Sequence, residues 1–448
     1  MELNRLWIWV VSGVAPVLAL ALVMPQASRS AGAGAPAALH IVFSSEQNGY
    51  LTPCGCSSPM LGGIPRLASY LKAYAPDAAV VKVNNGDLTP ANGRQDELKA
   101  EAIVDSLTAL NYDAINLGEK DFRLGLPYLM ALKRRFSGAL LCGNASVGGE
   151  RLFPQDVIRL NHLGPRWARV GIVGLLSPTF QDEVAAAVPG VTLSSPAITL
   201  RALAPVLSTG AEIRVLLYHG PRSEAMDLAR QFPFFQLIID AHEGDSPSEI
   251  EHVRGVTITS AGQDGKYVGD ASFAADPNWA ISGLRFVALG PDLHDDPTML
   301  NIKRDYLLRV EAEDLLGRVP QTRTDNGDSY AGSQACSRCH GDAVKVWKAS
   351  GHSLAFATLA AQGEQKDPEC VVCHTVGFGR QTGFSSPEKT PSMQDVGCES
   401  CHGPALKHTQ DPKVHLEKVG EEICGVCHTS RQSPNFDFTH YWPLIKHS

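Results

Sequence analysis

Between about residues 38 and 300, short apolar runs alternate along the chain with longer stretches of mixed polarity. The stretches 63–75 and 94–110 carry apolar residues at helical spacing and predict helices. The short runs are rich in Val, Ile and Leu and predict buried strands at residues 37–45, 78–87, 114–118, 138–146, 168–176, 213–220, 235–242 and 256–262. Strands that alternate with helices indicate an α/β layered fold, in which functional residues gather at the carboxyl ends of the strands.

The pattern changes after residue 300. Residues 301–317 predict a helix, and the polar sequence that follows, with Pro320 and several Thr, Asp, Asn and Gly residues, predicts a linker. We therefore expect an α/β domain over 38–300, a helix and linker over 301–330, and a second domain over 331–448.

The first residues do not fit this alternation. Arg5 precedes a 19-residue apolar run, Leu6–Met24, which is followed by a stretch rich in Ala, Gly and Ser. This arrangement predicts an export signal over residues 1–33, either cleaved after Ala33 or kept as an anchor in the inner membrane. A buried helix of the first domain is the remaining alternative. With either form of the export signal, we expect the rest of the protein in the periplasm or elsewhere outside the cytoplasm.

Composition excludes several classes. The 448 residues carry a net charge of −8, are 44% hydrophobic and 19% charged, and contain no long basic run, so a disordered chain and a nucleic-acid partner are not expected. Cysteine and histidine are unevenly distributed: eight of 11 Cys and nine of 15 His lie in the last 118 residues. One uniform globular enzyme would not show this skew.

Four C-x-x-C-H motifs explain the skew. They end in the proximal ligand candidates His340, His374, His402 and His428. Their cysteines are Cys336, Cys339, Cys370, Cys373, Cys398, Cys401, Cys424 and Cys427. C-x-x-C-H is the attachment signal for haem c, in which two thiols bind the vinyl groups and the histidine binds the iron. Four complete motifs behind an export signal favour four covalent haems over structural zinc or a disulfide framework.

Five histidines of this region lie outside the motifs and are candidates for the sixth iron ligand: His352, His408, His415, His440 and His447. His415 lies in a polar stretch and is the weakest of them. The alternative for each is an ordinary surface residue. A haem with two histidine ligands suits electron transfer, and one without a distal ligand would have an open iron. The sequence leaves the pairing open. With about 30 residues for each haem, the porphyrins themselves must form most of the core.

The region 331–448 resembles the tetrahaem cytochrome c554-like family in the segments around its four motifs, including GHSLAFATL, VGCESCHGPALKH and FTHYWPLIKH. The resemblance implies a small domain of helices and irregular loops. It also implies distal ligands at His352, His408 and His447, mostly bis-histidine haems, and one iron that can be five-coordinate.

Polar residues follow the predicted strands of the first domain in a recognisable order. The segments are 45–50, 85–87, 117–121, 218–220 and 240–244. They resemble the motifs of calcineurin-like metallophosphatases of the 5′-nucleotidase family, and the resemblance implies that family's layered fold with a two-metal hydrolytic centre. Several positions depart from its pattern: the first motif has Glu46 and Asn48 for Asp and His, Glu119 replaces Asn, Lys120 replaces the catalytic His, and Gly244 the last His.

Asp87, His219 and His242 keep the expected residue type. A two-metal hydrolase needs a full set of carboxylate, imidazole and amide ligands, so we expect hydrolysis to be lost or rebuilt. The alternatives are one divalent metal held by Glu46, Asp87, His219 and His242, with Glu119 nearby, or a cleft without an ion in which Lys120 neutralises the carboxylates. An active hydrolase is the weaker alternative.

Cys54, Cys56 and Cys142 remain outside the haem motifs. Cys54 and Cys56 come directly after the first polar segment, Cys142 follows the apolar part of the run 138–146, and all three could converge at the site edge of the sheet. They form either a disulfide that leaves one free thiol, or a soft-metal, sulfur-binding or redox site. The SoxB branch of the resembled superfamily handles sulfur compounds, which keeps a sulfur ligand in view at the level of fold analogy.

Together these observations predict an exported tetrahaem cytochrome that transfers electrons between redox protein partners. We expect its α/β domain to serve in docking or ligand binding. A multihaem oxidoreductase acting on a small sulfur or nitrogen compound is the alternative.

Overall fold

The computed structural model describes residues 38–447 apart from 54–58, 164–165 and 417. The predicted export segment and two of the three unassigned cysteines, Cys54 and Cys56, therefore lie outside the described residues. Ala37–Ser448 form one compact unit. No helix of the described part has the length and apolar character needed to cross a membrane.

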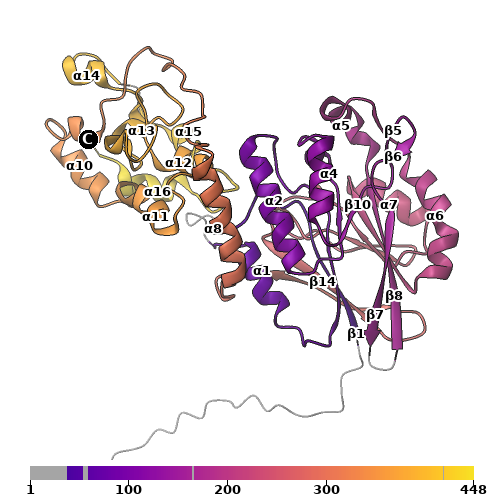
Figure 1. Cartoon of the computed structure of the whole chain (residues 1–448). Helices are drawn as coiled ribbons and strands as arrows, with labels where there is room; N and C mark the ends of the chain where they lie inside the picture. Colours follow the sequence, from indigo (N-terminus) through magenta and orange to yellow (C-terminus); the bar gives the residue numbers. More distant parts are fainter. Residues whose placement is uncertain (1–37, 54–58, 164–165, 417, 448) are drawn as a thin grey trace, which may run out of the picture. The chain divides into compact units, whose positions relative to one another are not determined.

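Two six-stranded sheets form the centre of the α/β domain (Figure 1). The first sheet has the order β15 (Ile281–Ala288), β14 (Tyr267–Ala274), β1 (Ala38–Ser44), β2 (Ala79–Asn84), β3 (Ala114–Asn116) and β4 (Ala139–Leu141). The second has the order β12 (Glu251–Val253), β13 (Val256–Thr259), β11 (Leu237–Ile239), β10 (Ile213–His219), β8 (Arg166–Leu176) and β7 (Asp156–Leu163). The strands predicted from the apolar runs are confirmed.

Neighbouring strands β1, β2, β3 and β4 are parallel, as are β8, β10, β11 and β13. Both sets of carboxyl ends therefore carry loops that can contribute to one site. A small third sheet joins β6 (Glu150–Arg151), β5 (Ala145–Val147) and β9 (Val191–Leu193).

Helices cover the outer face of each sheet. The helices of this domain are α1 (Ile64–Leu71), α2 (Arg94–Ala109), α3 (Glu119–Phe122), α4 (Leu126–Arg135), α5 (Gln181–Ala187), α6 (Pro196–Gly210), α7 (Arg222–Gln231) and α8 (Pro297–Ala312), with a 3₁₀ turn at Pro178–Phe180. Successive strand residues point to opposite faces, so Val42 packs towards the helices while Ile41 and Phe43 pack between the sheets. The result is a four-layer αββα domain.

The helix predicted within 301–330 is α8, and it begins earlier, at Pro297, where Asp296 caps it. Met299, Tyr306 and Val310 of this helix join the hydrophobic core formed by α1, α2 and the first sheet. The expected boundary at residue 300 thus falls inside a helix that packs as part of the α/β domain. A separate small core begins at Leu316.

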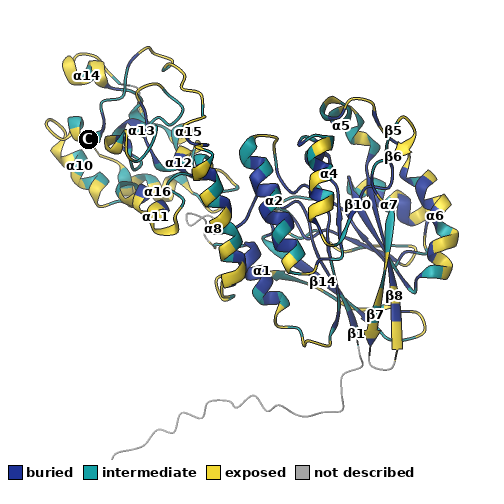
Figure 2. Cartoon of the chain, viewed as in Figure 1, coloured by how far each residue is buried: buried dark blue, intermediate teal, exposed yellow. Residues whose placement is uncertain are grey.

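The C-terminal region consists of short helices and loops. Its helices are α9 (Ser333–Cys336), α10 (Gly341–Lys348), α11 (Ala355–Gln362), α12 (Pro368–His374), α13 (Cys398–His402), α14 (Leu406–Gln410), α15 (Glu421–Cys424) and α16 (Phe438–Ile445), with 3₁₀ turns at Gly351–Leu354 and Pro391–Met393. Figure 2 shows mostly intermediate and exposed residues on these helices, in contrast to the buried strands of the α/β domain.

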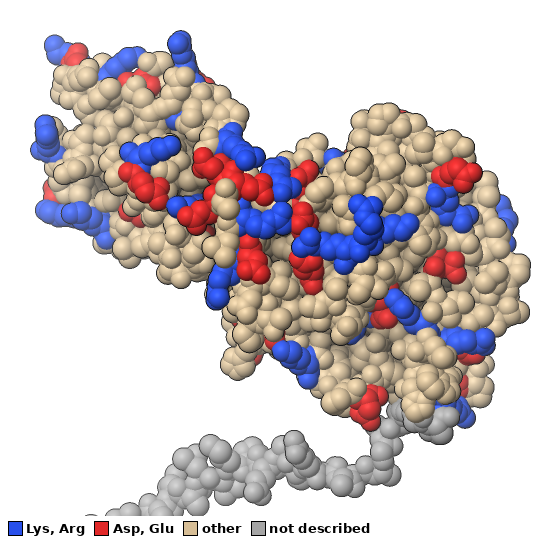
Figure 3. Space-filling view, in the orientation of Figure 1, with Lys and Arg blue, Asp and Glu red and all other residues tan. Residues whose placement is uncertain are grey.

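On the face shown in Figure 3, charges of both signs are interspersed over α2 and α8, whereas basic side chains gather at the last turn of α4. Arg94 bonds Glu97 and Glu313, and Arg309 bonds Glu101.

Candidate functional site

The polar residues singled out in the sequence meet at the carboxyl ends of both sheets. Glu46 follows β1, Asp87 follows β2, Glu119 begins α3 directly after β3, His219 ends β10, and His242 follows β11. An asparagine side chain joins the ends of the two sheets by hydrogen bonds. Asn85 donates to the carbonyls of Tyr218 and Ile239 in the second sheet, at 3.3 and 2.9 Å.

Two glycines allow these loops to approach so closely. A Cβ atom on Gly118 would lie 2.2 Å from Asp87 Oδ1 and 2.5 Å from the His219 ring. Gly86 has φ of +80°, and a Cβ there would lie 2.4 Å from the Gly118 nitrogen. Any larger residue at either position would push the site apart.

Four polar residues of the site also have left-handed backbone: Glu46 (φ 46°), Asn48 (47°), Asp87 (52°) and His242 (64°). Such a conformation costs roughly 1–3 kcal/mol for each non-glycine residue, and it is found mainly where function requires it. The fold holds four strained residues around one centre, which supports a functional role for that centre.

Asp87, Glu119, His219 and His242 each direct one ligand atom into a space where all four atoms lie within 4.8 Å of one another. His219 Nε2 is 3.1 Å from Glu119 Oε2 and 3.5 Å from Asp87 Oδ1. His242 Nε2 is 3.2 Å from Glu119 Oε2 and 3.0 Å from His219 Nε2. Two imidazoles and two carboxylates form a donor set that suits a divalent transition metal.

The hydrogen bonds behind the imidazoles support this fit. His219 Nδ1 is 2.6 Å from the Asn85 carbonyl oxygen, which only accepts, so Nδ1 carries the proton. In the neutral ring, the lone pair of Nε2 then points into the cluster. His242 Nδ1 lies 3.6 Å from Glu46 Oε1, an electrostatic contact that is too long for a hydrogen bond. The His219 lone pair and the carboxylates of Asp87 and Glu119 are directed at one point, which favours a bound cation.

The charges of the centre are strongly coupled. Burial alone would lower the pKa of His219, but Asp87 and Glu119 outweigh burial and hold that pKa well above its ordinary value. Burial would raise the pKa of Glu119, yet His219 and His242 lower it. Without a metal, the centre therefore favours a protonated imidazole between ionised carboxylates, which is the same charge pattern that a cation would stabilise.

Lys120 occupies the other side of Asp87. Its Nζ is 2.6 Å from Asp87 Oδ2 and 3.3 Å from Asn48 Oδ1. Burial lowers the pKa of Lys120, and Asp87 more than compensates and raises it. Asp87 thus directs Oδ1 towards His219 in the cluster and Oδ2 towards the ammonium group of Lys120. This arrangement is the one expected if Lys120 neutralises the carboxylates.

Glu46 is the member of the predicted metal set that is not among the four clustered ligands. Its Oε2 accepts a hydrogen bond from the His242 backbone nitrogen at 3.0 Å, and burial raises its pKa. Glu119 stands where the resembled motif has an asparagine. It takes the place in the cluster that the sequence assigned to Glu46.

Cys142 does not lie at an open site edge. It is fully buried in the core between the first sheet and its helices, and burial raises the pKa of its thiol to about 12. A buried thiol with so high a pKa is not a reactive or redox group at neutral pH. Cys142 is therefore not available for the expected thiol site. Cys54 and Cys56 lie outside the described residues.

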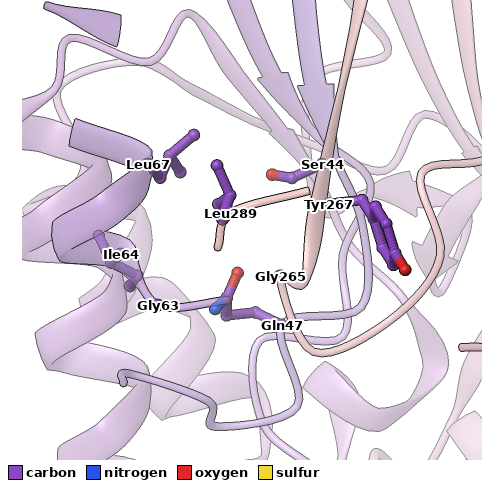
Figure 4. A pocket seen from close by; sticks show the side chains of 8 residues that line it. All are labelled: Ser44, Gln47, Gly63, Ile64, Leu67, Gly265, Tyr267 and Leu289. Carbon is purple, nitrogen blue, oxygen red and sulfur yellow. The ribbon is translucent and has the colours of Figure 1, made fainter. Parts of the chain in front are cut away.

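A small pocket lies beside the loop that follows β1 (Figure 4). Its lining residues are Ser44, Gln47, Gly63, Ile64, Leu67, Gly265, Tyr267 and Leu289. No carboxylate, imidazole or thiol is among them. Gln47 donates to the Tyr50 carbonyl at 2.5 Å and lies against Gly265.

In the C-terminal region, the structure brings motif histidines opposite histidines from elsewhere in the sequence. The ring centres of His340 and His408 are 6.0 Å apart, those of His352 and His428 are 6.2 Å apart, and those of His402 and His447 are 5.9 Å apart. Each pair joins one C-x-x-C-H histidine to one of the three distal candidates that the family resemblance implied.

These separations fit one iron between the rings of each pair. Two metal–imidazole bonds of about 2 Å, plus the distance from each nitrogen to its ring centre, add up to roughly 6 Å. Hydrogen bonds at Nδ1 leave Nε2 for the metal: His408 Nδ1 lies 2.7 Å from the Val414 carbonyl, and His447 Nδ1 lies 2.9 Å from the Ile445 carbonyl. Such supporting contacts are the usual way in which a protein orients a ligating histidine.

The second motif differs. His374 Nδ1 contacts the Ala355 carbonyl at 2.6 Å, but within the described part of the chain no imidazole is recorded opposite its ring. The ring of His440, the fourth distal candidate, instead packs edge-on against Tyr441 at 5.0 Å. His415 is exposed.

Sequence reasoning missed two supporting residues. Asp121 accepts from the backbone nitrogens of Asp87, Leu88 and Gly118, and burial followed by Asp87 raises its pKa to about 7. Its position three residues after Gly118, as in a helix-capping box, was the available signal. The second is Arg431 of the C-terminal region, which contacts the loop after β1.

Comparison with known proteins gives separate matches for the two regions. Residues 335–403 match the family model of cytochrome c554 and c-prime. Cytochrome c-554 of Nitrosomonas europaea is 31% identical over 134 residues, covering 22% of this chain and 57% of that protein. The chain therefore spans little more than half the length of this curated relative.

Solved structures match the α/β domain. The calcineurin-like phosphoesterase YfkN from Bacillus subtilis has a TM-score of 0.53 at 18% identity, covering 61% of this chain and 98% of that one. A 5′-nucleotidase precursor from Thermus thermophilus has a TM-score of 0.53 at 19% identity, covering 73% of this chain and 68% of that one.

The sulfate thiohydrolase SoxB of Thermus thermophilus also has a TM-score of 0.53, at 17% identity, covering 62% of each chain. At these identities the likeness concerns the fold. The protein thus joins a domain with the calcineurin-like phosphoesterase fold to a C-terminal segment that matches the cytochrome c554 family model.

Proposed function

We propose that this protein is an exported tetrahaem cytochrome that transfers electrons between redox protein partners outside the cytoplasm. The observation that carries the proposal is the set of three histidine pairs with ring centres 5.9–6.2 Å apart, each combining a motif histidine with a distant one. A haem with two histidine ligands has no open position, so its function is electron transfer.

In this proposal, the eight motif cysteines attach four haems. His340 and His408 hold the first, His402 and His447 the third, and His428 and His352 the fourth; His374 holds the second from one side. Bound haem supplies reversible one-electron chemistry. The chain's own contribution is to orient the ligands, as Val414 does for His408 and Ser433 for His428, and to hold the haems close together.

The α/β domain, in this proposal, binds a ligand or partner without hydrolysing phosphate esters. Two-metal hydrolysis needs a second ion that shares a bridging carboxylate with the first. Here the second oxygen of Asp87 faces the Lys120 ammonium at 2.6 Å. An ammonium group supplies charge but no coordination site for a nucleophilic water. We expect no phosphatase turnover with Mn²⁺, and measurable turnover would contradict this part of the proposal.

Haem counting and electron paramagnetic resonance test the main proposal. We expect four haems per chain by absorbance and mass spectrometry, with three low-spin centres and one high-spin centre. His408→Ala should convert one low-spin haem to high spin, whereas His415→Ala, at an exposed histidine of the same region, should leave the spectrum unchanged. A spectrum that is equally insensitive to both substitutions would refute the assigned pairs.

A second candidate function rests on His374. Because no described imidazole lies opposite it, the second haem is the candidate for an open iron that binds a small nitrogen or sulfur compound, which would make the protein an oxidoreductase. Carbon monoxide added to the reduced protein is the probe. One molecule bound per chain supports this function, and no binding leaves the pure electron carrier.

The apolar segment 6–24 supports export, with cleavage and anchoring as the two alternatives. We propose that the mature protein lies in the periplasm, where haem c is attached to exported chains. Sequencing of the mature amino terminus distinguishes the cleaved form, which begins at Gly34, from one that keeps the segment as an anchor.

A further inference from the structure

Arg431 forms a polar contact between the C-terminal region and the α/β site. Its Nη2 donates to the Asn48 backbone carbonyl at 2.8 Å, and its Nε donates to Asp264 at 3.1 Å. Nη2 also lies 3.0 Å from the other Asp264 oxygen, so the guanidinium grips this carboxylate with two nitrogens. Such a planar, two-point pair fixes geometry better than a single contact does.

Both partners of Arg431 belong to the surroundings of the four-ligand cluster. The Asn48 side-chain oxygen is 3.3 Å from Lys120 Nζ, which in turn is 2.6 Å from Asp87. Asp264 donates its backbone nitrogen to the Glu46 carbonyl at 2.8 Å. Arg431 therefore contacts the strained loop that carries Glu46 and Asn48, and through Asn48 it reaches the fixed ammonium beside Asp87.

On its other side, Arg431 lies three residues after His428, in the turn that follows the fourth motif. Ser433, two residues further on, contacts His428 Nδ1 at 3.0 Å. Asn48, Asp87 and Asp264 are all buried. Electrostatic effects act more strongly through a buried polar network than across water.

We propose that Arg431 is a positioning residue that couples the two centres, so that the charge at the Asp87–Lys120 pair sets the reduction potential of the fourth haem. This inference rests on the haem assignment of the proposed function. Added positive charge at the cluster favours the reduced haem, so a bound cation raises the potential. By thermodynamic reciprocity, the cation binds more tightly to the reduced protein by the same factor.

The first test uses the complete haem-loaded protein and Mn²⁺. We expect the potential of one haem, followed in a haem-resolved redox titration, to rise by an amount that corresponds to about threefold tighter Mn²⁺ binding in the reduced state. At 59 mV per tenfold for one electron, this is about 30 mV. Arg431→Ala and Asp264→Asn, which remove the contact from opposite sides, should abolish the shift while Mn²⁺ still binds.

Arg380→Ala is the matched control. Arg380 also pairs with an aspartate, Asp325, and its side chain is 37% exposed, compared with 38% for Arg431. It should retain the full shift. A shift that persists in Arg431→Ala would show a through-space effect and overturn the proposal, as would the absence of any shift in the natural protein when Mn²⁺ binds.

The second test changes the charge without a metal. Lys120→Met removes one positive charge beside Asp87 and should lower the same potential by about 30 mV, the threefold change expressed with the same constant. Lys120→Arg should not lower it. In the double variant with Arg431→Ala, the effect of Lys120→Met should disappear.

These arms separate the possible failures. If Mn²⁺ does not bind but Lys120→Met lowers the potential only when Arg431 is present, the cation site is wrong and the coupling stands. If neither arm moves a potential, the coupling is wrong. A haem count below four, measured beforehand, would contradict the proposed function itself.

Discussion

In the α/β domain, side chains such as Leu217 and Ile239 are fully buried between two sheets, whereas α10, α14, α15 and α16 of the C-terminal region contain no fully buried residue in the described chain. The first domain thus forms its core from its own side chains. The second has only a small core around Phe356, Val371 and Phe384. A region of this size without a large core needs another source of buried apolar surface, and the proposed haems would provide it.

The comparison also concerns how each region holds its functional residues. In the α/β domain, strand ends and close glycine contacts fix the cluster even without a ligand. In the C-terminal region, motif and distal histidines come from short helices and loops that are far apart in sequence. The two regions should therefore respond differently when ligands or core residues are removed.

The largest expected effect is the loss of haem. Protein produced without haem attachment should retain a folded α/β domain, while 331–448 unfolds, because the polypeptide alone buries too little apolar surface there. Limited proteolysis with mass spectrometry measures this: cleavage should spread through 331–448 and spare 38–315. Protection of the C-terminal region in haem-free protein would contradict the idea that haem forms its core.

The next effect tests the opposite case, a core made of side chains. Leu217→Ala, between the two sheets, should lower the free energy of unfolding of the α/β domain by about 2–5 kcal/mol. Leu308→Ala on α8, where the leucine is 56% exposed, should change it by less than about 0.5 kcal/mol. Urea denaturation gives both values, and similar losses at the two positions would contradict this prediction.

How much the sequence could predict differs between the regions in the same way. The apolar runs located the strands, because a buried strand leaves a local signal. The motif histidines were also readable, since their spacing is local. The sequence could not show that Glu119, and not Glu46, joins the ligand cluster. Both residues follow strands, and only the three-dimensional approach of β3 and β10 decides between them.

Arg431 illustrates the limit more strongly. It lies 383 positions from Asn48, which accepts its hydrogen bond, so no pattern within either segment indicates the contact. Similarly, five histidines were available for the distal positions, and loops of irregular structure decide which ones meet a motif histidine. Residue-by-residue resemblance to a family suggested three of them, and periodicity or composition suggested none.

A third effect concerns charge in the α/β domain. Asp270 is bound by His40, Tyr74 and Arg285. Burial would raise its pKa, but His40, Tyr74 and Arg285 lower it from 3.8 to about 2. Because the pKa of Asp270 is lower in the folded than in the unfolded protein, its carboxylate stabilises the fold at pH values above the unfolded-state pKa. This stabilisation is lost as the pH falls from about 4 to about 2. With allowance for partial solvent screening, the contribution at neutral pH is about 2 kcal/mol.

Asp270→Asn should therefore lower the free energy of unfolding by about 2 kcal/mol at pH 7 and flatten its decline between pH 4 and pH 2. The comparison variant is Asp105→Asn, which breaks the exposed pair with Arg135 and should cost less than about 1 kcal/mol. Denaturation curves at several pH values supply the measurement. An acid decline of unchanged slope in Asp270→Asn would rule out this carboxylate as its source.

The smallest expected effect bears most directly on the contrast between the cores. Leu444 on α16 is 66% exposed, more than Leu308, and by exposure alone its truncation should cost nothing. However, it lies three residues before His447, whose ring centre is 5.9 Å from that of His402. A haem held by these two histidines places a large apolar surface beside α16.

Leu444→Ala should then cost about 1 kcal/mol in the haem-loaded protein, as expected for a few buried methyl or methylene groups. Urea denaturation followed by haem absorbance measures this cost. If the loss is as small as that of Leu308→Ala, the exposed leucine is ordinary surface. If it is larger, the exposed fraction of Leu444 in the polypeptide alone understates its burial in the haem-loaded protein, because the haem that covers it contributes to the core.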